Sequence, residues 1–177
     1  MKAVKLTENI YWVGVIDWNL RNFHGYLTQK GSTYNAYLVI DDKVTLIDTV
    51  KEAFTDEMLA RISSVIDPSK INYIISNHAE MDHSGAIPAM LEKIPGAELI
   101  ASVNGEKNLK EHFREDWKVR TVKAGDTLNT GKYTFTFVPE PMVHWPDSMV
   151  TYLEAEKILF SNDAFGQHLA TSERFDD

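Results

Sequence analysis

The sequence predicts a layered α/β domain. Three observations lead to this fold class: strand-like segments at the start, a stretch in which strand and helix periodicities alternate, and a second group of strand-like segments toward the end. Strand groups on both sides of a βαβα stretch are typical of a layered domain rather than a simple doubly wound sheet. The 177 residues suffice for one domain with a substantial hydrophobic core.

The first third of the chain contains three predicted strands and one predicted helix. β-branched and aromatic residues predict strands over residues 10–15, 34–40 and 44–49. Asp41, Asp42 and Lys43 predict the turn between the last two of these strands. Apolar residues recur at helical spacing over 58–66, and Pro68 ends that helix.

Strands and helices continue to alternate in the middle of the chain. The apolar run 71–75 predicts a buried strand, and the polar residues 76–83 follow it. We expect the next helix to begin at Ser84, whose hydroxyl can cap the free amides, with Pro88 early enough to be tolerated. The remaining predicted elements are a helix over 105–113 and strands over 98–101, 118–122, 133–138, 149–153 and 158–160.

The composition excludes several classes of partner and site. With 26 acidic against 18 basic residues the net charge is −8, which disfavours binding to nucleic acid and anionic membranes. The absence of cysteine excludes disulfides and thiolate metal sites. The N-terminal residues lack the basic-then-apolar pattern of a signal peptide, and no apolar stretch is long enough to span a bilayer. We therefore expect a cytoplasmic protein.

The segment His-Ala-Glu-Met-Asp-His at 78–83 concentrates four potential metal ligands between a buried strand and a helix. His78, Glu80 and Asp82 alternate, so an extended chain would project them to one side. His83 follows directly and can turn toward a second centre. One ion needs only three or four protein ligands, so this segment together with later candidates suits two adjacent ions. The alternative is a polar strand-to-helix loop with incidental histidine and acidic residues.

Two further candidate ligands follow later strands. His144 comes after the strand at 133–138, and Asp163 comes after the strand at 158–160. Taken singly, each fits a packed histidine or an Asn-Asp turn as well as a ligand. Their shared position after strands favours ligands, because such loops gather at one edge of a sheet. Carboxylates and imidazoles without a thiolate favour iron or manganese over zinc.

These motifs resemble those of the flavodiiron proteins, a branch of the metallo-β-lactamase superfamily. The resemblance rests on His-x-Glu-x-Asp-His at 78–83, His-Trp-Pro-Asp-Ser-Met at 144–149 and Asn-Asp-Ala-Phe-Gly at 162–166, and it extends over essentially the whole chain. Most hydrolases of the superfamily have a histidine where Glu80 stands, which disfavours a zinc hydrolase. The resemblance implies a metallo-β-lactamase-like αββα sandwich over residues 1–177, truncated before its final elements.

The resemblance also implies roles for individual residues. One iron would be bound by His78, Glu80 and His144, and the other by Asp82 and His83, with Asp163 bridging. In some family members the histidine matching His83 turns away from iron. His24 would lie over the iron pair and hydrogen-bond the bound gas or supply protons, although a surface loop histidine is the alternative. Trp145 would pack near the site and face the flavin of a partner subunit.

Three other residues receive weaker assignments. Asp48 matches an aspartate that orients the ligands from behind, with a strand-end turn as the alternative. We expect His168 to have no more than a structural part. His112 lies in a charged helix and is expected to be solvated.

The activity implied by the resemblance is reduction of dioxygen to water or of nitric oxide to nitrous oxide at two non-haem irons. Electrons would come from FMN in a flavodoxin-like domain, reduced by a donor such as rubredoxin or a flavin reductase, within a head-to-tail homodimer. Nothing in the sequence matches that domain, and the family's remaining iron-binding histidine would lie beyond Asp177.

Three alternatives to this activity stay open at this point. The first is a metal-dependent hydrolase on the same fold. The second is a non-catalytic diiron sensor that binds O2. The third is an unstable, metal-free chain that aggregates through an unfinished sheet.

Overall fold

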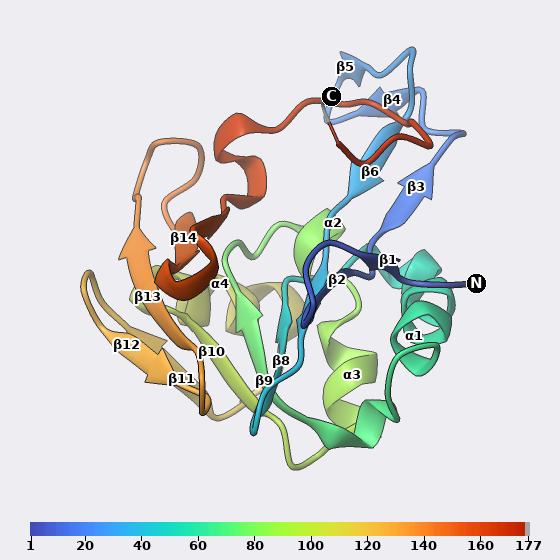
Figure 1. Cartoon of the computed structure of the whole chain (residues 1–177). Coiled ribbons are helices and arrows are strands. Elements are labelled where there is room, and N and C mark those ends of the chain that lie inside the picture. The colour runs from blue at the N-terminus through green and yellow to red at the C-terminus, as the bar shows by residue number, and fades with distance from the viewer. Residues whose placement is uncertain (176–177) are drawn as a thin grey trace.

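Two β-sheets form the centre of the molecule, a computed structural model that describes residues 1–175 (Figure 1). The larger sheet has the order β1 (Val4–Lys5), β2 (Ile10–Trp12), β7 (Tyr37–Val39), β8 (Val44–Ile47), β9 (Ile71–Ser76), β10 (Glu98–Ser102) and β11 (Val119–Val122). The smaller sheet has the order β12 (Thr127–Asn129), β13 (Thr134–Pro139), β14 (Met149–Leu153) and β15 (Ile158–Phe160). Strands β8 to β11 are parallel, so their carboxyl ends lie at one edge.

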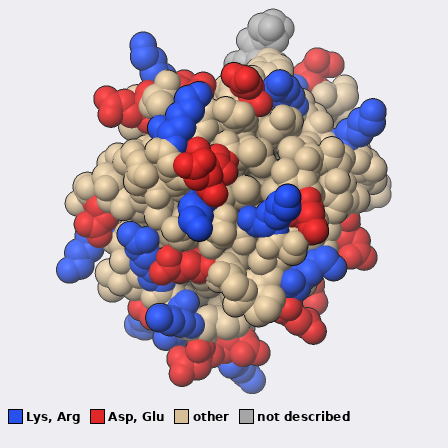
Figure 2. All heavy atoms as spheres, turned by 60° about the horizontal axis from the view of Figure 1, so that its bottom comes forward, with Lys and Arg blue, Asp and Glu red and all other residues tan. Residues whose placement is uncertain are grey.

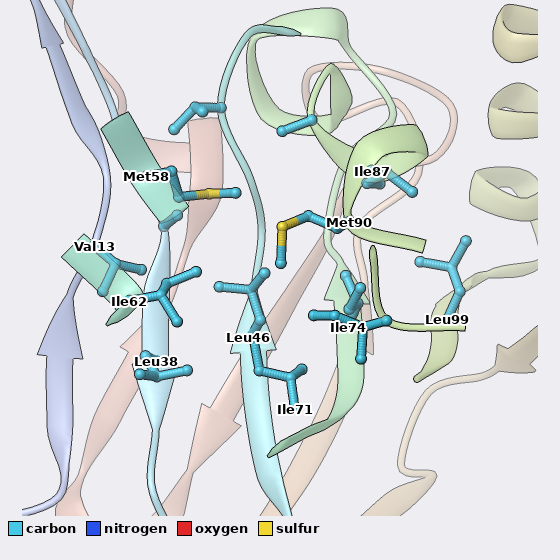
Figure 3. Close-up of a cluster of buried hydrophobic side chains, with 14 of the residues drawn as sticks. Val13, Leu38, Leu46, Met58, Ile62, Ile71, Ile74, Ile87, Met90 and Leu99 are labelled. Atoms are coloured by element: carbon cyan, nitrogen blue, oxygen red, sulfur yellow. The ribbon is translucent and has the colours of Figure 1, made fainter. Parts of the chain in front are cut away.

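Three helices cover the outer face of the seven-stranded sheet: α1 (Thr55–Ser63), α3 (Ile87–Lys93) and α4 (Val103–Phe113). Met58 of α1 and Met90 of α3 are fully buried against Leu46 and Ile74 of the sheet (Figure 3). These contacts follow from the helical spacing of the apolar residues, which places them on one face of each helix.

A second hydrophobic cluster fills the space between the two sheets. Ile47, Ile75 and Ile100 of the larger sheet pack there with Phe135 and Phe137 of β13. Alternate residues of β13 point the other way, as expected for a strand with one buried face. The packing gives three layers in the order α, β, β, and the described residues place no α-helix on the far side of the smaller sheet.

Several predicted boundaries are wrong in instructive ways. The segment 34–40 is not one strand: β6 (Ser32–Tyr34) pairs with β3 (Val15–Asp17), and only β7 joins the large sheet. Strand β12 was not predicted. Ser84 does not begin a helix, because it ends the short helix α2 (Met81–Ser84) and its hydroxyl donates to the carbonyls of Ala79 and Glu80. Pro88 does lie in the first turn of α3, as predicted.

A small extension lies beyond the carboxyl edge of the large sheet. It contains the pair β3 and β6 and the hairpin β4 (Asn22–Phe23) and β5 (Tyr26–Leu27). The C-terminal segment runs back to it (Figure 1), where Ala170 donates its backbone N–H to the carbonyl of Lys30 at 2.7 Å. Residues 171–175 contain no helix or strand.

The charged side chains are mixed on the face seen in Figure 2. Lysines and arginines alternate there with aspartates and glutamates, so the excess of acidic groups is not gathered on that face. Among residues 1–175, no helix has the length and apolar character required to cross a bilayer.

Candidate metal centre

The predicted ligand segment begins where β9 ends, and Asp48 holds the chain there. Asn77, immediately before His78, donates its backbone N–H to Asp48 Oδ1 at 2.7 Å and its side-chain N–H to Oδ2 at 3.0 Å. Asn77 in turn accepts a bond from the backbone N–H of Met149, the first residue of β14, at 2.9 Å. Burial raises the pKa of the Asp48 carboxyl above its usual value, and the nearby His83 and the Asn77 donors offset this only in part. Asp48 thus positions the start of the ligand segment through Asn77.

Four candidate ligands converge on one point. One donor atom from each of His78, Glu80, His144 and Asp163 lies within 4.8 Å of all the others. Glu80 Oε2 is 3.2 Å from His78 Nε2 and 3.4 Å from His144 Nε2. His78 and Glu80 are buried, whereas His144 enters from the exposed loop between β13 and β14. Three parts of the chain that are distant in sequence therefore meet at this point.

Asp82 and His83 form a neighbouring group. His83 Nε2 lies 2.9 Å from Asp163 Oδ1 and 3.3 Å from Asp82 Oδ2. The other oxygen of Asp163, Oδ2, lies 3.4 Å from His144 Nε2. One carboxylate therefore faces both groups of donors, with one oxygen toward each.

The path of the chain between the two groups differs from the prediction. Glu80 is extended, but Asp82 and His83 lie in α2 rather than in an alternating strand. The amides of His83 and Ser84 both donate to the carbonyl of Glu80, which closes a helical turn directly after it. This turn directs Asp82 and His83 toward Asp163.

The electrostatics of the site match those of a cation site. Burial lowers the pKa of His78, but hydrogen bonds to Asp147 and Glu80 outweigh it and raise that pKa to about 9. Burial raises the pKa of Asp163, yet the His83 imidazole lowers it to about 2. Buried carboxylates without metal thus hold their imidazole neighbours in the protonated form.

Buried polar atoms without hydrogen-bond partners provide a test of metal binding. Asp82 Oδ1 and both ring nitrogens of His83 are such atoms. Although His83 Nε2 is 2.9 Å from Asp163 Oδ1, the two are not aligned for a hydrogen bond. A nitrogen and a carboxylate oxygen that lie this close without a hydrogen bond between them are suited to bind one cation together. The carboxylate and imidazole donor set without thiolates therefore fits two iron ions.

A cavity of about 470 Å³ opens over these donors. His24 lines it and places Nε2 2.6 Å from Glu80 Oε1, from a left-handed backbone conformation with φ of 48°. Trp145 also lines it, with its ring 5.1 Å from that of His78. His24 is exposed but reaches the site directly. His168, which lines the same cavity, bonds Ser32 Oγ at 3.2 Å rather than a candidate ligand.

Two residues near the site were not predicted to act there. Asp147 is buried and lies 3.1 Å from His78 Nδ1. His112, expected to be only solvated, is exposed but donates its Nδ1–H to the carbonyl of Ala79 at 3.0 Å. Asp147 stands three residues after His144 in a motif already noted, yet neither contact follows from sequence spacing.

The metal-free chain is expected to lose stability as the pH rises from about 6.5 to about 9. The pKa of His78 is raised in the folded state, so its contribution is fully present below 6.5 and is lost as the pH passes through about 9. Urea unfolding in chelator across this range measures the effect. A His78→Asn variant should show a smaller loss, because His83, whose pKa burial lowers but the Asp163 and Asp82 carboxylates raise, still contributes. An equal loss in that variant would contradict the assignment.

Comparisons with known proteins agree with this geometry. Residues 33–176 match the family described as "ODP family beta lactamase". The chain belongs to this family. It is 49% identical over 179 residues to a nitric oxide reductase of Moorella thermoacetica, and the match covers 99% of this chain and 45% of that protein. It is 51% identical to a rubredoxin-oxygen oxidoreductase of Megalodesulfovibrio gigas, covering 100% of this chain and 44% of the relative.

Solved structures confirm the fold class. The rubredoxin oxygen:oxidoreductase from Desulfovibrio gigas superimposes with a TM-score of 0.96 at 51% identity, over 99% of this chain and 44% of that one. The flavodiiron protein from Giardia intestinalis gives a TM-score of 0.95 at 41% identity, over 99% and 43%. The resemblance to the metallo-β-lactamase-like domain of flavodiiron proteins is thus confirmed. The chain spans less than half the length of these relatives.

Proposed function

We propose that this chain forms the diiron centre of a reductase that converts dioxygen to water or nitric oxide to nitrous oxide. The observation that carries the proposal is the position of Asp163, whose two oxygens face two separate groups of histidine and carboxylate donors. Such an arrangement suits a bridging ligand between two ions. The names of the relatives, a nitric oxide reductase and a rubredoxin-oxygen oxidoreductase, support this choice of reaction.

The residues divide into two sets around the bridge. His78, Glu80 and His144 would bind one iron, and Asp82 and His83 would bind the other, with Asp163 shared. When bound, the iron pair supplies open coordination positions and electrons for the gas. His24 lines the cavity with its Nε2 2.6 Å from Glu80 Oε1, in reach to transfer a proton to the gas. Phe23 and Trp145 line the same cavity.

Electron delivery is assigned to parts outside these residues. We propose a longer protein in which residues 1–177 form the diiron domain and a flavodoxin-like domain holds FMN. The share of the relatives that the chain covers, 44–45%, supports this division. Trp145 would face the flavin of the other subunit in a head-to-tail dimer in the cytoplasm. Rubredoxin or a flavin reductase would act as donor, which the name of one relative supports for rubredoxin.

Metal content and gas consumption test the proposal together. Chain purified from iron-supplemented medium is expected to contain about two irons, as a dinuclear site requires. After chemical reduction under nitrogen and removal of excess reductant, the loaded chain would hold two electrons, enough to convert two NO to one nitrous oxide and one water. Reduction of O2 to two waters takes four electrons, so it should proceed only with an electron donor present throughout. Zinc with esterase activity would instead indicate a hydrolase. An O2-dependent spectrum without turnover would indicate a sensor, and a metal-free chain would refute the proposal.

Replacement of His24 is expected to slow gas reduction without removing iron. His24→Ala should lower the rate by about 10²–10⁴-fold, the usual contribution of a group that transfers protons. Single-turnover rates of the reduced protein, with iron content measured in parallel, provide the test. His168→Gln is a matched control, because it alters a histidine of the same cavity that bonds Ser32 instead. Equal rates for wild type and His24→Ala would contradict the role.

A further inference from the structure

Asp147 joins three elements at the back of the proposed metal centre. It belongs to the loop between β13 and β14 and is 1% exposed. Its Oδ2 accepts the backbone N–H of Ala79 at 2.7 Å and lies 3.1 Å from His78 Nδ1. Its Oδ1 accepts the side-chain N–H of Asn108, on α4, at 2.9 Å. Each of these three contacts is within hydrogen-bonding distance, and two of them are made with the ligand segment 78–83.

The contact with His78 determines which ring nitrogen faces the site. Nδ1 points at Asp147, whereas Nε2 lies 3.2 Å from Glu80 Oε2 and 4.0 Å from Asp163 Oδ2. An acceptor at Nδ1 keeps the proton on that nitrogen, and the lone pair of a neutral ring is then at Nε2. That lone pair therefore points toward the carboxylates of Glu80 and Asp163, the other candidate metal ligands. A carboxylate behind a histidine is a common means of fixing the orientation of a metal ligand.

Helix α4 fixes Asp147 in turn. Ser102, which caps the helix, donates its hydroxyl to the carbonyl of Asp147 at 2.9 Å. Asn104 donates to the carbonyl of Pro146 at 2.8 Å, and His112 donates to the carbonyl of Ala79 at 3.0 Å. The backbone of Ala79 is therefore held on both sides, its N–H by Asp147 and its carbonyl by α4. This places Glu80, the next residue, as well as His78.

We propose that Asp147 is a positioning residue that fixes the ring of His78 and the turn leading to Glu80 for metal binding. The inference rests on the proposed function, since it requires that these two side chains bind iron. It assigns to Asp147 the supporting role that the sequence suggested for Asp48, which bonds Asn77 instead. The carboxylate acts through His78 and Ala79 and does not itself contact the gas.

Two variants of Asp147 distinguish the effect of its hydrogen bonds from the effect of its negative charge. Asp147→Ala removes the acceptor of both the His78 and Ala79 N–H groups. Asp147→Asn can keep that acceptor if its carbonyl oxygen takes the place of Oδ2, with the Asn108 amide turned to accept from the new NH2 group. The alanine variant should therefore lose about 10–100-fold in iron affinity, the usual cost of losing such a partner. The asparagine variant should recover most of it.

The test is competition for Fe²⁺ with a chromophoric chelator under nitrogen, on wild type, both variants and Asn104→Ala. The last is a matched control, because it frees the same loop without touching the carboxylate. A second readout is the Nδ1–H resonance of His78 in Zn²⁺-loaded protein with ¹⁵N-labelled histidine, which six histidines keep resolvable. We expect this proton to be shifted downfield and protected from exchange in wild type and Asp147→Asn, but not in Asp147→Ala.

The outcomes distinguish this inference from the proposed function. If wild type binds no iron, both are overturned. If wild type binds iron and Asp147→Ala binds equally tightly, or Asn104→Ala loses as much, only the role of Asp147 is overturned. Unfolding temperatures in chelator show whether Asp147→Ala folds. If it does not, the asparagine variant decides: a protected His78 proton with iron retained supports the role, and iron retained without that proton refutes it.

Discussion

Asp163→Ala is expected to reduce the iron content of the chain from about two ions to below about one, because it removes the ligand that two ions share. Asp163 Oδ1 lies 2.9 Å from His83 Nε2, and Oδ2 lies 3.4 Å from His144 Nε2. Without it, each remaining group has too few donors for a closed site. Two neighbouring imidazoles would also lose the carboxylate that offsets their charge when the metal is absent.

Iron and protein determined on the same sample measure this effect, and Asp116→Ala serves as its control. Asp116 is 99% exposed in its side chain and, among residues 1–175, pairs only with Lys110. Its removal changes the net charge by the same amount as that of Asp163. The control should keep about two irons. Full iron content in Asp163→Ala would show that the shared carboxylate is not a ligand.

Phe135→Ala is expected to lower the free energy of unfolding by about 3–5 kcal/mol, the usual cost of removing a buried phenylalanine. Phe135 is fully buried between the two sheets, with Phe137 on the same face of β13. The loss combines the apolar surface returned to water with the cavity left behind. Because β13 leads into the loop that holds His144, weaker iron binding should accompany the loss of stability.

A neighbouring residue of the same strand provides the control for Phe135. Val138 points to the other face of β13 and is 38% exposed. Val138→Ala should cost less than about 1 kcal/mol, since little buried volume is lost. Denaturant unfolding of both variants tests the prediction, and equal losses would show that the inter-sheet cluster does not dominate stability.

Sequence reasoning located the site because its residues follow strands. His78, His144 and Asp163 were each expected at a strand end. His78 follows β9 of the larger sheet, whereas β13 and β15 of the smaller sheet both run antiparallel to β14, so the loops that follow these two strands lie at the same end of that sheet. The alternation of His78, Glu80 and Asp82 was misinterpreted as extended chain. The helical turn after Glu80 depends on amides bonded to its carbonyl, which residue spacing does not encode.

The supporting contacts could not be predicted because they join residues far apart in the chain. Asp147 and Ala79 are separated by 68 positions, and His112 and Ala79 by 33. Their partners are backbone groups, so no residue type at the other end marks the contact. The break between β6 and β7 was missed for a similar reason. These two strands pair with different strands, and the choice of pairing partner depends on contacts between residues that are distant in the sequence.

The candidate ligands come from both sheets: the ligand segment follows β9 of the larger sheet, whereas His144 and Asp163 follow β13 and β15 of the smaller one. A metal bound at this junction would stabilise the folded state by its binding free energy, because the unfolded chain does not bring the ligands together. Newly made chains that find no iron would therefore open more often and meet cellular proteases first. The abundance of the protein is then expected to fall, after translation, when the iron supply of the cell is low.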